Sequence, residues 1–227
     1  MSHVFITGTN RGIGLELTKA FLDGGHAVTA TARDPQNSQE LKSLAVDFLD
    51  KLTLVTLDVN KPETFVNLKK ISGPIDYLIN NAGIALNYNQ KFTELDSEDV
   101  AKMYATNVLG PIKVTQTLLP QLRKSSKPVI AQISSIMGSV ADNSSGGAIG
   151  YRMSKSALNM LNKCMSIELN DITCVVLHPG WVQTDMGGAN APVKPKDSAA
   201  GLYNVISKLK ASDSGKFYDY QGKSLPW

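Results

Sequence analysis

Two side chains four residues apart on one predicted helix could carry acid–base chemistry. Tyr151 and Lys155 stand near the start of a helix expected from about Gly150 or Tyr151 to Asn170. Residues at positions i and i+4 share a helix face, with Cβ atoms about 5–6 Å apart. A nearby ammonium group lowers a phenol pKa from about 10, so the pair predicts a general acid/base that works near neutral pH. A solvated surface pair at the same spacing is the alternative.

Two further polar positions fit the same chemistry. Ser134 and Ser135 follow the predicted strand Val129–Ile133, and a hydroxyl group there can donate a hydrogen bond to a substrate carbonyl oxygen. Asn107 lies inside the predicted helix Glu98–Leu122. Asparagine is a poor residue for a helix interior, so a polar role is plausible, with a solvated side chain as the alternative.

A glycine-rich turn follows the first predicted strand, Val4–Ile6. Its sequence is Gly8-Thr9-Asn10-Arg11-Gly12-Ile13-Gly14, and a helix is expected from Gly12 to Leu22. Glycines permit the sharp turn from strand to helix, and the free N–H groups and dipole of a helix N-terminus attract phosphate. The spacing differs from the usual G-x-G-x-x-G, and a purely structural turn is the alternative. Its position between the first strand and the first helix favours dinucleotide binding.

The end of the second predicted strand, Ala27–Ala32, indicates which dinucleotide binds. An NAD-binding fold usually places Asp or Glu there, for the adenosine ribose hydroxyls. This chain reads Thr31-Ala32-Arg33 instead, and Arg11 lies in the glycine-rich turn. Guanidinium groups pair well with a 2′-phosphate, so we expect NADP(H) in preference to NAD(H), which stays possible.

The elements that must position these residues alternate along the chain. Runs rich in β-branched residues are separated by helical patterns, which predicts βαβ units, a parallel sheet and right-handed crossovers. We expect an α/β fold: one Rossmann-like, doubly wound sheet of about seven strands with helices on both faces, in one domain over residues 1–227. The remaining predicted strands are Leu52–Leu57, Ile75–Ile79, Thr173–Leu177 and Lys216–Tyr220, and the last predicted helix is Ser198–Lys210.

Composition excludes several classes of protein. The net charge is +3, from 23 basic and 20 acidic residues, and the longest Lys/Arg runs are pairs, so nucleic-acid binding is not expected. No apolar stretch is long enough to span a membrane. The two cysteines and three histidines show no metal-ligand spacing, so no metal site is expected. A reducing, cytoplasmic setting fits this cysteine content.

Taken together in chain order, these motifs resemble the classical short-chain dehydrogenase/reductase family. The resemblance extends from residue 4 to beyond 180 and is closest to the branch of the C-factor and the sniffer-type carbonyl reductases. The segments that carry it are Thr7–Gly14, Asp58-Val59, Asn80-Asn81-Ala82-Gly83, Asn107, Ser135, Tyr151-Arg152-Met153-Ser154-Lys155 and His178-Pro179-Gly180-Trp181-Val182-Gln183-Thr184-Asp185-Met186.

The resemblance implies a role for each matching residue. Tyr151 would give a proton to the carbonyl oxygen, Ser135 would orient that oxygen, and Asn107 would hold a water molecule in the proton relay. Lys155 would hold the nicotinamide ribose and tune Tyr151. Asp58 would bind the adenine amino group. The remaining implied cofactor contacts are Gly8, Asn10, Arg11, Gly12, Ile13, Gly14, Arg33, Val59, Asn81, Ala82, Gly83, Pro179, Gly180, Val182 and Thr184.

This chain departs from the family pattern in two places. Ser135 lies sixteen residues before Tyr151, which is longer than usual, and Ser139 lies twelve before it and competes for the same role. Ser135 is preferred because it directly follows the strand, with the extra residues assigned to Asp142–Gly147. The segment after Thr184 is short, so an open pocket with broad selectivity is expected.

Two functions remain open at this point. The leading hypothesis is an NADP(H)-dependent reductase that converts an aldehyde, ketone or quinone to an alcohol by hydride transfer. The alternative is a C-factor-like cell-signalling protein that binds NAD(P), with catalysis secondary. A small-molecule carbonyl substrate and a homodimer or homotetramer are implied by the resemblance.

Overall fold

One parallel sheet of seven strands organises the computed structural model, which describes residues 1–227. The strand order is β3-β2-β1-β4-β5-β6-β7, and every neighbouring pair is parallel. The order reverses between β1 and β4, which creates a switch point where ligands bind in such sheets. The strands are β1 (His3–Thr7), β2 (Ala27–Ala32), β3 (Leu52–Thr56), β4 (Tyr77–Asn80), β5 (Val129–Ile133), β6 (Thr173–His178) and β7 (Phe217–Asp219).

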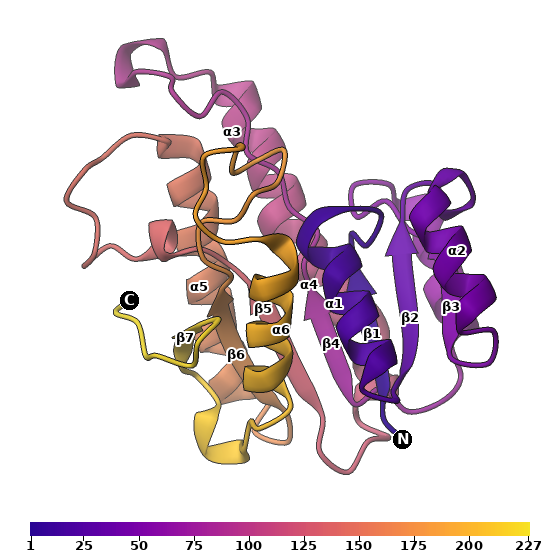
Figure 1. The fold of residues 1–227 in the computed structure, drawn as a ribbon. Helices are drawn as coiled ribbons and strands as arrows, with labels where there is room; N and C mark the ends of the chain where they lie inside the picture. The colour runs from indigo at the N-terminus through magenta and orange to yellow at the C-terminus, as the bar shows by residue number, and fades with distance from the viewer.

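Helices cover both faces of this sheet (Figure 1). One face packs against α1 (Gly12–Asp23), α2 (Gln39–Asp47) and α6 (Pro195–Ile206), around a core that includes Ile6, Phe21 and Leu202. The other face packs against α4 (Gly110–Leu122) and α5 (Ile149–Glu168), around Phe5, Leu118 and Ile130. All five residues of β5 are buried, as expected for a central strand covered on both sides. The predicted doubly wound α/β fold is confirmed.

The observed elements differ from the predicted ones mainly at their ends. Helix α6 begins at Pro195, where proline occupies the first turn, and ends at Ile206, before the predicted Lys210. Strand β4 begins at Tyr77 instead of Ile75. Helix α2 was not predicted from the sequence, because Leu41 is its only buried residue and no apolar periodicity marks it. Its one local signal is Ser38, whose side chain accepts a hydrogen bond from the Leu41 N–H.

The long helix predicted over Glu98–Leu122 contains a π-helical turn. Helix α3 (Ser97–Tyr104) begins at its N-cap Asp96 and runs into the turn Ala105–Leu109, which continues directly as α4. A kink was expected at Gly110-Pro111, but the irregular hydrogen bonding lies immediately before it. Single π-helical turns are frequent at functional sites, and this one contains Asn107.

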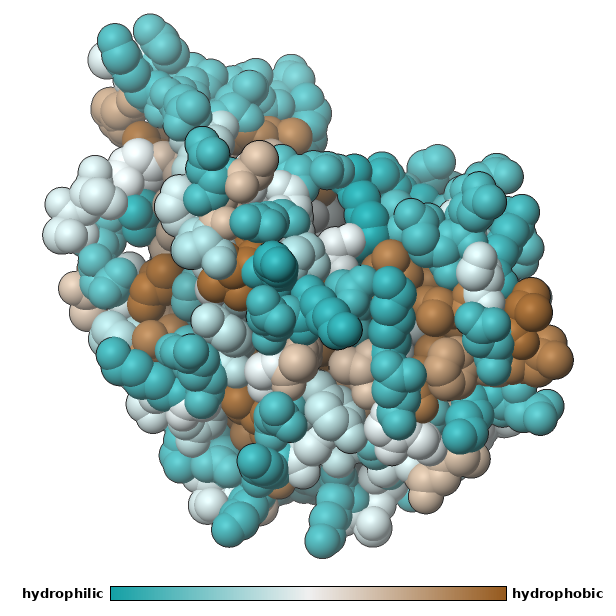
Figure 2. Space-filling view, viewed as in Figure 1, coloured by the Kyte–Doolittle hydropathy of each residue, from teal (hydrophilic) through white to brown (hydrophobic).

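The molecular surface is mostly hydrophilic on the side that bears α1 and α6, with small separate hydrophobic patches (Figure 2). One such patch lies beside α2, where Val46 and Leu49 are exposed. None of the helices has both the length and the apolar composition needed to cross a membrane.

Helix α5 carries a row of exposed apolar side chains. Met153, Met160 and Ile167 recur every seven residues, and each is more than half exposed. A seven-residue period keeps side chains on one helix face. Exposed apolar rows of this kind mark sites of protein association, and the neighbouring α3 adds the half-exposed Tyr104. This face is where we expect a second copy of the chain to pack.

A charge placed in this row tests the expected dimer or tetramer. Light scattering of the parent protein at micromolar concentration should give two or four times 24.5 kDa, with a two-fold interface. Met160→Lys should shift the population toward the 24.5 kDa species, because it buries a charge at the interface. Val46→Lys, on α2, serves as the matched control. A parent protein that is monomeric under these conditions would contradict the expectation.

Candidate active site

A cavity of about 540 Å³ lies along the carboxyl ends of the central strands. Figure 2 shows the surface hollowed near the N-terminal end of α1. The cavity brings together segments that are far apart in sequence. Its lining includes the predicted residues Gly8, Asn10, Arg11, Gly12, Ile13, Gly14, Arg33, Asp58, Val59, Asn81, Ala82, Gly83, Tyr151, Lys155, Pro179 and Thr184.

The glycine-rich turn is fastened to the end of β4. The Thr7 hydroxyl accepts hydrogen bonds from the N–H groups of Asn81 and Ala82, each at 3.0 Å. The Asn81 side chain donates in return to the carbonyl oxygens of Thr7 and Gly8, also at 3.0 Å. A Cβ on Gly14 would lie 2.2 Å from the Gly8 oxygen, so only glycine allows α1 to begin this close to β1.

The beginning of α1 suits a pyrophosphate group. The N-cap residue Arg11 makes no side-chain cap, and the first turn contains no acidic residue. No protein group accepts a hydrogen bond from the N–H groups of Gly12, Ile13 and Gly14. These donors and the positive end of the helix dipole border the cavity. The residues present therefore fit the phosphates of a nicotinamide dinucleotide.

The two predicted phosphate-binding arginines have different surroundings. Arg33 follows β2, is exposed and forms no ion pair. Arg11 is paired instead with Asp185, on the segment that follows β6. Asp34 is directed to the Asn37 side-chain amide, 2.6 Å away. No carboxylate therefore stands at the ribose position at the end of β2, and Arg33 is the cation that is free there.

Tyr151 lies in the first turn of α5 and is buried. Its ring centroid is 6.0 Å from the ring of Tyr88. Burial, with a smaller contribution from Tyr88, raises the pKa of Tyr151 above its usual value, while a hydrogen bond with the Ser135 side chain acts in the opposite direction. The hydroxyl group is thus held as a neutral phenol over the physiological pH range, which is the form that can donate a proton.

Lys155 is buried one helical turn further along α5. Its Nζ donates a 2.9 Å hydrogen bond to the carbonyl oxygen of Ile133, the last residue of β5. Nζ lies 5.7 Å from the centroid of the Tyr151 ring. Burial lowers the pKa of Lys155 to about 8. The expected lowering of the Tyr151 pKa by Lys155 is wrong in this structure, because burial of the phenol is the largest effect on that pKa and raises it.

Asn107 connects the π-helical turn to two neighbouring segments. Its Oδ1 accepts a hydrogen bond from the Ile84 N–H at 2.8 Å, and its Nδ2 donates to the Ile84 oxygen and to Ser154 Oγ at 2.9 Å. A Cβ on Gly83 would lie 3.2 Å from Asn107 Oδ1 and 3.6 Å from Lys155 Nζ. Asn107 and Lys155 therefore both approach Gly83, in the segment that follows β4, although the Asn107 side chain is almost fully occupied by protein groups.

The two candidate serines have different partners. Ser135 accepts a hydrogen bond from the Met137 N–H at 3.2 Å and is close enough to Tyr151 to affect its pKa. Ser139 Oγ donates to the carbonyl oxygen of Trp227 at 3.0 Å and accepts from the Asp142 N–H at 3.0 Å. Ser135 is therefore the serine that the fold places at Tyr151, and Ser139 fastens the loop that follows.

Some of the predicted site residues are not part of the cavity lining, and some residues that do line the cavity were not predicted. Asn107 and Ser135 are not among the lining residues, Gly180 packs on Tyr220, and Val182 is buried in a bridge with Val193. Ligands bind at the carboxyl ends of the strands in a parallel sheet. This rule could have identified several of the missed residues, because they end β2, β3 or β5 or directly follow one of these strands. Ser134, which was considered together with Ser135, also lines the cavity. The unpredicted lining residues are Thr31, Ala32, Leu57, Asn60, Ile84, Thr106, Ile133, Gln183, Asp185, Met186 and Pro195.

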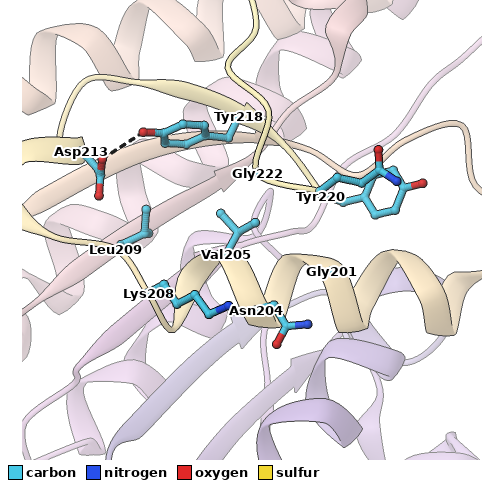
Figure 3. Close-up of a pocket in the computed structure, with 10 residues that line it drawn as sticks. Gly201, Asn204, Val205, Lys208, Leu209, Asp213, Tyr218, Tyr220 and Gly222 are labelled. Atoms are coloured by element: carbon cyan, nitrogen blue, oxygen red, sulfur yellow. Dashed lines mark hydrogen bonds between the residues drawn. The ribbon is translucent and has the colours of Figure 1, made fainter.

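A second cavity, of about 490 Å³, lies between α6 and β7 (Figure 3). The Tyr218 hydroxyl donates a 2.9 Å hydrogen bond to Asp213 at its edge. Hydrogen bonds, first from Lys216, lower the pKa of Asp213. None of the residues predicted for chemistry lines this cavity. Tyr151, Lys155 and the glycine-rich turn line the cavity at the carboxyl edge of the sheet, which is therefore the candidate site.

Comparisons with known proteins agree with this geometry. Residues 2–194 match the family model described as short chain dehydrogenase. The C-signal of Myxococcus xanthus is 46% identical over 158 residues, which are 69% of this chain and 95% of that protein. The carbonyl reductase Sniffer of D. melanogaster superposes with a TM-score of 0.94 at 34% identity and covers both chains completely. The NADPH-bound carbonyl reductase from chicken fatty liver gives a TM-score of 0.94 at 37% identity, over 100% of this chain and 99% of that one.

Replacing Lys155 with methionine tests the burial of its charge. Because its pKa is about 8 when folded and 10.5 when free, a charged Lys155 costs the folded state about 3 kcal/mol at pH 7. This cost is complete below pH 8 and disappears above 10.5. Lys155→Met should therefore raise the free energy of unfolding at pH 7 by on the order of 1–3 kcal/mol, since the lost hydrogen bond offsets part of the gain. Urea unfolding at several pH values measures this, and parallel pH dependences of parent and variant would refute the burial argument.

Proposed function

The chain belongs to the short-chain dehydrogenase/reductase family, in the branch of the C-factor and sniffer-type carbonyl reductases, and we propose that it reduces a small aldehyde, ketone or quinone with NADPH. It is an oxidoreductase by family. The observation that carries the proposal is the buried, neutral Tyr151 phenol beside Ser135 and Lys155, at the end of a cavity that begins at the free N–H groups of α1.

The chemistry divides between cofactor and protein. A bound nicotinamide supplies a hydride to the carbonyl carbon. As the C=O bond becomes a C–O single bond, Tyr151 gives its phenolic proton to the oxygen and is left as a phenolate until solvent returns the proton. Ser135 Oγ donates a hydrogen bond that orients the same oxygen. The raised pKa of Tyr151 makes it a ready donor only when negative charge develops on that oxygen.

Lys155 has two tasks in this proposal. Its ammonium holds the nicotinamide ribose hydroxyls, and its positive charge stabilises the phenolate that Tyr151 becomes. The hydrogen bond to Ile133 fixes the ammonium at the end of β5. Asn107 completes the arrangement through its bonds to Ile84 and Ser154, which hold the loop after β4 against α5. The water-holding role inferred for Asn107 would fall to its backbone, since its side chain is engaged.

The preference for NADPH rests on the end of β2. Arg33 is unpaired and exposed at the cavity, and no acid stands at Ala32 to receive ribose hydroxyls. A guanidinium group binds a phosphate through several donors at once. The NADPH-bound carbonyl reductase of similar fold supports the same choice. Arg11 would contribute only after release from Asp185.

A signalling role is the second candidate function. The similarity to the C-signal of Myxococcus xanthus favours it. The complete set of Asn107, Ser135, Tyr151 and Lys155 favours catalysis, because a protein that only binds a dinucleotide needs no proton donor. Oxidation of NADPH in a screen of aldehydes, ketones and quinones separates the two, since a pure signalling protein would bind NADPH without oxidising it.

Replacing Arg33 with alanine tests the choice of cofactor. The parent protein should bind NADPH more tightly than NADH in a fluorescence titration. Arg33→Ala should narrow that gap by on the order of 1.5–3 kcal/mol, the range for a hydrogen bond to a charged group. Arg123→Ala removes an arginine from an exposed ion pair with Asp171 and should leave both affinities unchanged. Equal affinities of the parent for the two cofactors would refute the NADPH preference.

Replacing Tyr151 with phenylalanine tests the proton donor. The variant loses one oxygen atom and keeps the ring, so NADPH affinity should change little, while turnover should fall at least about 10²-fold. Lys155→Ala should lower both turnover and NADPH affinity, because two tasks are lost. Steady-state rates together with NADPH titration separate these effects. Near-normal turnover of Tyr151→Phe with a good carbonyl substrate would show that another group donates the proton.

A further inference from the structure

The chain between Ser135 and Tyr151 forms a long loop with an unusual approach to α5. Three successive residues have left-handed backbone conformations: Gly146 at φ +63°, Gly147 at φ +70° and Ala148 at φ +45°. Glycine adopts this region freely, but alanine does so at a cost. Ala148 is buried and stands immediately before the first turn of α5. Other contacts must therefore hold this approach in place.

The guanidinium group of Arg152 supplies these contacts. Its Nε donates hydrogen bonds to the carbonyl oxygens of Gly146 and Gly147, each at 3.1 Å. One terminal nitrogen donates to Ser145 Oγ at 3.1 Å, and the other donates to the Met137 carbonyl oxygen at 3.4 Å. One planar group thus joins the arm that leaves Ser135 to the arm that enters Tyr151. Arg152 forms no ion pair, so all of the hydrogen bonds that its guanidinium group donates go to uncharged oxygen atoms.

The outer bend of the same loop has a separate attachment. The Trp227 carbonyl oxygen accepts hydrogen bonds from Ser139 Oγ and from the Ala141 N–H, each at 3.0 Å. The Trp227 ring lies 5.5 Å from the ring of Phe217. This attachment fixes the middle of the loop but touches neither arm near Tyr151. Other contacts hold the arm that leaves Ser135 directly to α5, from Lys155 Nζ to the Ile133 carbonyl oxygen and from Ser156 Oγ to the Gly138 carbonyl oxygen, each at 2.9 Å. Arg152 adds what these contacts do not, a link from Met137 on that arm to Ser145, Gly146 and Gly147 on the arm that enters Tyr151.

The arm that Arg152 holds also carries part of the surroundings of Tyr151. The Tyr88 hydroxyl group donates to Met137 Sδ, and the Tyr88 ring faces Tyr151 at 6.0 Å between centroids. Burial raises the pKa of Tyr88, and the nearby Arg152 charge opposes that rise. A shift of Met137 would thus move Tyr88 as well as Ser135 relative to Tyr151.

We propose that Arg152 is a positioning residue: by holding the arm after Ser135 against the arm before Tyr151, it keeps these two side chains at their working separation together with the contacts of α5. This inference rests on the proposed function, because it takes those two side chains as the reacting groups. Arg152 acts through the carbonyl oxygens of the two arms and need not touch substrate or cofactor. Lysine cannot take its place, because a single ammonium group lacks the flat fork of donors that reaches both arms at once.

The test compares Arg152→Gln and Arg152→Lys with the parent protein and with Arg123→Gln, a control at an exposed arginine away from the site. Turnover of the best carbonyl substrate should fall about 10²-fold in both Arg152 variants, the effect of a misplacement near 1 Å. The KM for that substrate and the Kd for NADPH should change less than about threefold. The substitutions leave unchanged the residues that bind substrate and cofactor equally in the ground state and the transition state. Arg123→Gln should behave like the parent.

Chemical rescue separates positioning from simple stabilisation. Guanidinium ion at low millimolar concentration should restore part of the turnover of Arg152→Ala, and equal concentrations of sodium chloride should not. Melting temperatures show whether each variant is folded. Normal turnover of folded Arg152→Gln, full recovery in Arg152→Lys, or unfolding of all three variants would overturn the inference. A parent protein that binds NADPH but reduces no carbonyl would instead refute the proposed function, so the two failures are distinguishable.

Discussion

The hydrogen bond from the buried Lys155 ammonium to the Ile133 carbonyl oxygen is the contact on which the candidate site depends. It fixes α5 to the carboxyl end of β5, so that Tyr151 and the residues after β5 share one location. The ammonium is held where water cannot solvate it, which lowers its pKa to about 8. The same burial raises the pKa of Tyr151. An arrangement that is unfavourable for stability thus prepares both groups for chemistry, a common trade-off at functional sites.

The rest of the fold keeps other segments at this location. The side chains of Thr7 and Asn81 join the glycine-rich turn to the end of β4, and Asn107 joins the next loop to α5 through Ile84 and Ser154. These contacts connect the phosphate end of the cavity with the end that holds Tyr151. The π-helical turn at Ala105–Leu109 allows Asn107 to point inward within an otherwise regular helix. The parallel strand order explains why residues so distant in sequence meet, because all the carboxyl ends lie on one edge.

Much of this could be predicted from the sequence, and the failures have physical reasons. The strands were found because buried parallel strands are continuous apolar runs; helix α2 was missed because it buries a single leucine. The glycine-rich turn and the Tyr151–Lys155 pair were found because their spacing is local. The pairing of Arg11 with Asp185 and the attachment of Ser139 to Trp227 join distant segments, and no local pattern reports them. The direction of the Tyr151 pKa shift was missed because burial is a property of the folded chain.

The central claim is that this site transfers hydride to a carbonyl carbon while Tyr151 supplies the proton. The most direct measurement is a single-turnover reaction with NADPH carrying two deuterium atoms at nicotinamide C4 and a panel of aldehydes, ketones and quinones, followed by mass analysis of the products. Each alcohol formed from an aldehyde or ketone should carry one deuterium, bonded to the former carbonyl carbon. Tyr151→Phe should give almost no product in the same time. Binding of NADPH without deuterium transfer or NADPH oxidation with any of these substrates would contradict the central claim.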